Sequence, residues 1–187
     1  DSLPATLKDG ANSVTAPTVV SSVGDISLKS RTGKIYESFI DSTPDVIADV
    51  LTLDAKTGIV NLQVAINQLD AQSTAGDIQI SDVDGASELY QGMLIVQAKA
   101  ATTGTTVTLT ADNSLNVGRY ADAATSMSAL DGKVTAGTIR LVSNNQSVTV
   151  AKPSAGEALN YTSGIAFNAK KVVDLYKIFL TDPALPL

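Results

Sequence analysis

Two aspartates in the stretch SDVDG, residues 81–85, have the spacing that most resembles a metal-binding loop. Carboxylates at alternate positions before a glycine are typical of calcium loops. The full EF-hand pattern also needs an oxygen ligand two positions before Asp82 and a glutamate at its twelfth position, where this chain has Ile80 and Gln91. The sequence therefore predicts a turn, with Asp82 and Asp84 as candidate contacts for a calcium ion and no other cofactor.

Carboxylates that follow apolar strands could instead act as the acid and base of a polysaccharide-cleaving enzyme. The candidates are Asp54, Asp82, Asp84 and Asp112, with Arg140 as the basic residue in a comparable place. Turns also favour aspartate, because its side chain bonds the nearby backbone. That simpler role accounts for all four positions, so we expect no catalytic residue and no enzyme activity.

Missing residue types exclude further chemistry. The chain has no cysteine and no histidine, which excludes disulfides, thiolate nucleophiles, Ser-His-Asp triads and most transition-metal sites. The net charge of −6 argues against nucleic acid as a partner, since phosphate binding needs clustered Lys and Arg. No run approaches the roughly 18 apolar residues of a membrane span, so we expect no membrane insertion.

The elements that must position these residues are short strands. Hydrophobic residues make up 44% of the chain and aromatic residues 4%, so the core must be aliphatic. Apolar residues alternate in five similar motifs, which indicates strands buried on one side. The pairs are Ile26 and Leu28, Leu51 and Leu53, Ile78 and Ile80, Val107 and Leu109, and Ile139 and Leu141.

The motifs start at residues 24, 49, 76, 104 and 137, so their spacings are 25, 27, 28 and 33 residues. A second and a third short apolar element follow most of them; after the motif at residue 49 these are Ile59 and the segment 64–72. The sequence therefore predicts an all-β fold, a parallel β-helix (β-solenoid) of about six irregular coils, in preference to a sandwich of hairpins. The Ala-rich insert 119–134 is expected to form a short helical turn.

We expect a single domain of residues 1–187. Within it, residues 1–23 are an N-terminal arm or cap, residues 24–165 form the repeat coils, and residues 166–187 are a C-terminal cap or docking segment. The first residue is not Met, which indicates a processed chain or a piece of a longer protein.

Three stretches resemble the repeats of filamentous-haemagglutinin-type and other giant bacterial surface proteins. They are LDAQSTAGDIQISDVDG (69–85), ATTGTTVTLTADNSLNVG (101–118) and TAGTIRLVSNNQSVTV (135–150). The resemblance implies a long right-handed parallel β-helix that is exported to the bacterial cell surface or secreted, and that serves in adhesion and biofilm contact.

The function expected from these observations is that of a structural, adhesive segment of a large surface or secreted protein. Its partners would be an extracellular surface, a glycan or protein ligand, or further copies of itself. The alternative is an extracellular filament subunit that joins head to tail through its ends. A polysaccharide-acting enzyme is the third and least favoured function.

Overall fold

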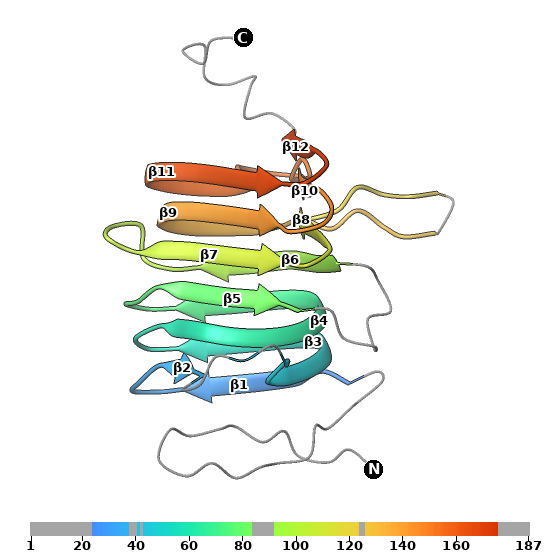
Figure 1. Cartoon of the computed structure of the whole chain (residues 1–187). Coiled ribbons are helices and arrows are strands. Elements are labelled where there is room, and N and C mark those ends of the chain that lie inside the picture. Colours follow the sequence, from blue (N-terminus) through green and yellow to red (C-terminus); the bar gives the residue numbers. More distant parts are fainter. Residues whose placement is uncertain (1–23, 38–40, 42, 84–91, 124–125, 176–187) are drawn as a thin grey trace.

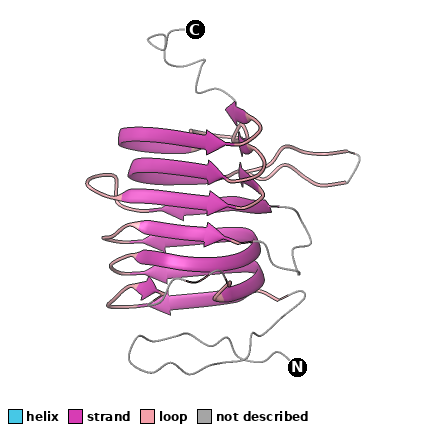
Figure 2. Cartoon of the chain, in the orientation of Figure 1, coloured by secondary structure: helices cyan, strands magenta, loops and turns pink. Residues whose placement is uncertain are grey.

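The computed structural model describes residues 24–37, 41, 43–83, 92–123 and 126–175. Within them the chain forms strands and loops but no helix (Figure 2), which confirms the all-β prediction. The strands are β1 (Ile26–Ser30), β2 (Ile35–Tyr36), β3 (Val46–Ala55), β4 (Ile59–Ser73), β5 (Ile78–Asp82), β6 (Gly92–Lys99), β7 (Thr106–Ala111), β8 (Ser114–Val117), β9 (Lys133–Ser143), β10 (Val148–Val150), β11 (Leu159–Ala169) and β12 (Val173–Leu175).

Five of these strands pair in a closed ring, in the order β4–β5–β7–β9–β6 and back to β4. Every pairing between named strands is parallel. The other strands lie outside the ring: β3 and β2 pair with β4, β1 with β3, β11 with β9, and β8, β10 and β12 continue from β6. Figure 1 shows β1 near one end of the array and β12 near the other.

The ring closes because β4 is long and pairs with two strands along its length. Its first part, up to Val64, lies beside β5, and its last part, from Gln68, lies beside β6. A register shift between Ile59 and Leu62 bends the strand, and Asn61 between them has a φ of 55°. Asparagine tolerates this left-handed conformation better than most residues, so the bend needs no glycine.

The prediction of a right-handed β-helix of about six coils is therefore wrong. That prediction took Ile59 and the segment 64–72 as separate short strands, each pairing only with its equivalent in the next repeat. The structure makes them one strand of 15 residues that crosses from one neighbour to another. The hydrogen-bonded ladders consequently join into a closed five-stranded parallel barrel with extra strands outside it.

The core is aliphatic, as the composition indicates. One row of inward side chains runs across four ring strands in register, and all four are fully buried: Ile59, Ile78, Val107 and Ile139. Burying a side chain of this size contributes roughly 1.5–3 kcal/mol. The alternation of apolar residues therefore predicted the inward positions correctly, even though it did not predict the closure.

The insert 119–134 contains no helix in its described residues, so that prediction is wrong as well. Isolated antiparallel bridges join Arg119 to Leu130 and Asp122 to Met127, and the segment projects sideways from the strands (Figure 1). The two ends of the insert lie against each other. They approach so closely that a Cβ on Gly132 would lie 2.0 Å from the backbone N of Gly118. Paired backbone groups, and not local helix propensity, determine its shape.

The predicted end segments are described only in part. Residues 1–23 and 176–187 lie outside the described residues, so the arm, the cap and the docking segment stay predictions. The described part of the C-terminal segment, residues 166–175, contains the end of β11 and all of β12.

Candidate functional site

Polar side chains form in-register rows on the outer side of the strands. Every second residue of a strand points outward, and parallel pairing places the outward residues of neighbouring strands in register, about 4.8 Å apart. One row contains Lys29, Asp54, Gln72, Lys99, Thr135 and Asn160, of which Thr135 is buried. The row beside it contains Ser27, Thr52, Asp70, Gln97 and Lys133.

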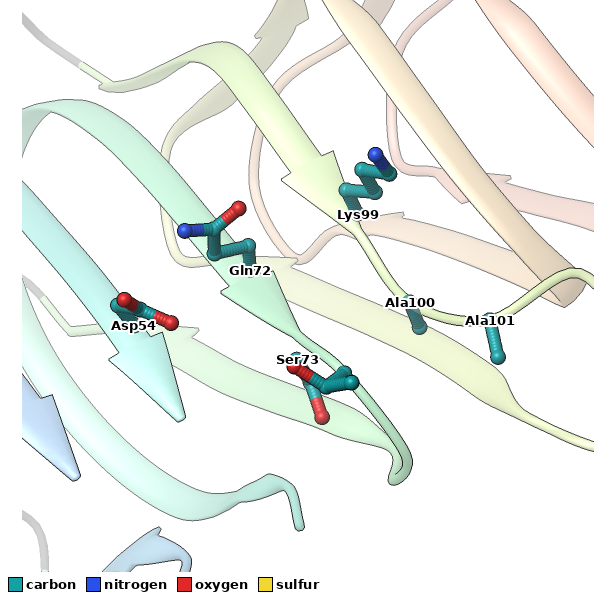
Figure 3. Close-up of a pocket in the computed structure, with 7 residues that line it drawn as sticks. Asp54, Gln72, Ser73, Lys99, Ala100 and Ala101 are labelled. Atoms are coloured by element: carbon teal, nitrogen blue, oxygen red, sulfur yellow. The ribbon is translucent and has the colours of Figure 1, made fainter. Parts of the chain in front are cut away.

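A hollow of about 250 Å³ lies where three neighbouring strands of this face end. Its polar side chains come from the carboxyl ends of β3, β4 and β6, where Figure 3 shows Asp54, Gln72 and Lys99 side by side. The lining also contains Ser73, Thr74, Ala100 and Ala101. The two alanines carry only methyl groups, which leaves space beyond the end of β6.

Charges around the hollow are unevenly paired. The ammonium of Lys29 forms an ion pair with Asp54, although both are too exposed for the pair to add much stability. The amide Nε2 of Gln97 donates to Asp70 Oδ1 at 3.2 Å. Lys99 and Lys133 are both exposed, and neither has an ion pair with any described residue. The face therefore offers two cationic groups together with carboxylates that are already engaged.

The candidate calcium residue Asp82 has a structural contact. It is 2% exposed, and its Oδ1 accepts a hydrogen bond from the backbone N–H of Ile66 at 3.1 Å. Strand β5 ends at Asp82, and the Asp82 carboxylate bonds the backbone of β4 at the point where β4 passes from β5 to β6. Asp84 lies outside the described residues, and calcium binding stays a prediction.

The other candidate residues of the enzyme hypothesis lie apart. Asp112 follows β7, and its Oδ1 accepts a hydrogen bond from Asn144 Nδ2 at 2.8 Å. Arg140 is exposed on β9, in register with Thr108 on one side and Ala166 on the other. Asp54 lies at the end of β3, a strand outside the ring that pairs with neither β7 nor β9. Among the described candidates, the structure brings together only the strand ends that carry Asp82 and Asp112, and their side chains bond different partners.

Sequence reasoning missed Gln72, Lys99 and Lys133. Each lies next to a buried residue of its strand, Ala71, Ala98 and Val134 respectively, so alternation alone marks it as outward. No motif places the three together, because the loops between their strands differ in length. Only the register of β4, β6 and β9 makes them neighbours.

The described residues contain no group of three or more Asp and Glu side chains placed to hold a metal ion. They also contain no helix long and apolar enough to cross a membrane. No family model matches the sequence, and no curated protein or solved structure is significantly similar to it. The resemblance to bacterial adhesin repeats therefore stays a prediction.

Proposed function

We propose that this chain is a structural, adhesive segment of a large bacterial cell-surface or secreted protein. The observation that carries the proposal is the pair of in-register polar rows on the outer side of the strands. A core of buried aliphatic side chains holds the backbone of these rows at fixed spacing, so a ligand meets polar groups whose positions along the strands are already set. The partner would be an extracellular glycan or protein.

Adhesion can be tested with beads coated with the purified chain. The beads are passed under flow over arrays of immobilised glycans and extracellular-matrix proteins, with albumin-coated beads as the control. The proposal expects stronger retention on at least one surface, and expects that retention to disappear when the chain is unfolded in urea before coating. Retention equal to that of albumin on every surface would contradict it.

A specific observation supports the filament as a second candidate. Inward residues of the outermost strands are only partly buried, namely Ile26 and Leu28 on β1 and Ile165 and Phe167 on β11. The outer edges of β1 and β11 also pair with no described strand. Exposed edges of this kind favour pairing with another chain. A filament subunit would lengthen with concentration in electron micrographs, whereas a constant monomer mass in sedimentation would reject this candidate.

A further inference from the structure

Lys99 and Lys133 form a cationic pair beside the hollow. Gln97 is in register with Lys133, and Lys99 with Thr135, so the two lysines are diagonal neighbours on β6 and β9. Strands about 4.8 Å apart, and a rise of about 3.3 Å per residue over two residues, give a separation of about 8 Å between their Cα atoms. Their side chains can therefore reach anionic groups on successive units of one extended ligand.

The surroundings restrict which anion fits. Asp70 lies on β4, the strand next to β6, and Asp54 lies one strand further away on β3. The whole chain carries a charge of −6. A densely charged polyanion, such as a nucleic acid or a highly sulfated polymer, would bring negative charge against these carboxylates. A ligand with a single anion per unit and hydroxyl groups beside it would instead donate hydrogen bonds to these carboxylates.

We propose that this face binds a linear polysaccharide whose sugars carry carboxylate groups. Lys99 and Lys133 would contact the carboxylates of the ligand, while the amide of Gln72 and the carboxylate of Asp54 would bond its hydroxyls at the hollow. The inference rests on the proposed adhesive function, and it names the class of ligand. A polymer that crosses from β3 through β4 to β6 meets Asp54, Gln72 and Lys99 in one row, and a diagonal step to β9 brings it to Lys133.

The contacts are exposed, so each contributes modestly. An exposed ion pair contributes an amount equivalent to roughly a threefold change in affinity. We therefore expect Lys99→Gln and Lys133→Gln each to weaken binding about threefold, and the double variant about tenfold, if the two contacts are independent. Lys170→Gln is a matched control, because Lys170 is also exposed but follows β11, away from the hollow.

Binding is measured by calorimetry with polygalacturonate, and with dextran, dextran sulfate and duplex DNA as comparison polymers, at fixed ionic strength. Thermal unfolding of each variant confirms that the exposed substitutions leave the fold unchanged. The inference expects polygalacturonate to bind, dextran not to bind, and the double variant to lose affinity while the control does not. Equal affinity for dextran sulfate or DNA would overturn it, and so would a double variant that binds like the parent chain.

Bead retention separates this inference from the proposed function. If beads adhere to another surface while polygalacturonate does not bind, the ligand class is wrong and the adhesive function survives. If beads adhere to no surface, the proposed adhesive function fails. Binding of polygalacturonate in the calorimeter would then show a ligand site that does not serve adhesion.

Discussion

Replacing Asp82 tests how the ring is closed. The carboxylate accepts a hydrogen bond from the N–H of Ile66 inside the protein, at the point where β4 changes partner. Asp82→Ala removes the acceptor and leaves a buried N–H unsatisfied. A hydrogen bond to a charged group contributes roughly 1.5–3 kcal/mol, and an unsatisfied buried donor costs a similar amount. We expect the free energy of unfolding to fall by about 2–3 kcal/mol.

Asp82→Asn separates the hydrogen bond from the charge. The amide oxygen can still accept from Ile66, so we expect this variant to lose only about 1 kcal/mol, because neutral hydrogen bonds contribute about half as much as charged ones. Asp54→Asn is the control, since it breaks a partly exposed ion pair and should cost no more than about 1 kcal/mol.

The assay is urea unfolding followed by circular dichroism, once in EDTA and once in excess calcium. An unchanged m-value across the variants shows that the midpoint shifts report stability. The reasoning is refuted if Asp82→Ala unfolds within about 0.5 kcal/mol of the parent chain. A parent chain that calcium stabilises, beside two Asp82 variants that it does not, would assign Asp82 to the cation as well, since a carboxylate has two oxygens.

Two further predictions concern turns. Gly76→Ala should destabilise the chain by about 1–3 kcal/mol in the same assay, because its Cβ would lie 2.0 Å from the carbonyl oxygen of Thr57. Gly164→Ala is the control and should be nearly neutral, because a Cβ there would have nothing within 4 Å. Equal losses of stability in the two variants would contradict this prediction. Ser154 donates through its hydroxyl and its backbone N–H to Asp131, which lowers the pKa of that carboxyl below 3.8. Ser154→Ala should therefore raise the pKa of Asp131 in an NMR titration, and an unchanged pKa would contradict the assignment. The contribution of this contact to stability is present above pH 3.8 and is lost as the pH falls through the lowered pKa of Asp131.

The sequence predicts strands and their buried sides well. Alternation identified Ile78, Ile80, Val107 and Leu109 as inward, and all four are fully buried. This succeeds because alternation is a local property, set by the pleat of a single strand. The aliphatic nature of the core also follows from composition, since the chain has no Trp and few other aromatic residues.

Closure of the ring could not be predicted in this way. Asn61 and Asn67 resemble turn residues, yet both lie inside β4, one at the bend and the other bonded through Nδ2 to Asp49 Oδ1 at 2.8 Å. Gly137 resembles the start of a strand, yet β9 begins at Lys133 and continues through it. Which strands pair depends on contacts between distant segments, and similar motifs do not specify them.

The candidate site depends on the same long-range register. The sequence marks Asp54 as a candidate because a carboxylate can act as an acid or a base, whereas Gln72 and Lys99 belong to no recognisable motif. Their loops have unequal lengths, so no repeat places the three residues beside one another. Parallel pairing of β3, β4 and β6 does so.

Disulfide trapping tests that register most directly, because the chain has no cysteine of its own. Cysteine pairs are introduced at Asp54 and Gln72, at Gln72 and Lys99, and, as the control, at Asp54 and Lys99. Adjacent parallel strands lie within the Cα separation of roughly 4.4–6.8 Å that disulfides need, whereas residues two strands apart do not. The structure predicts that mild oxidation of the folded chain closes an intramolecular bond in the adjacent pairs and not in the control. A control pair that closes as readily, or adjacent pairs that both stay reduced, would contradict the arrangement on which the site rests.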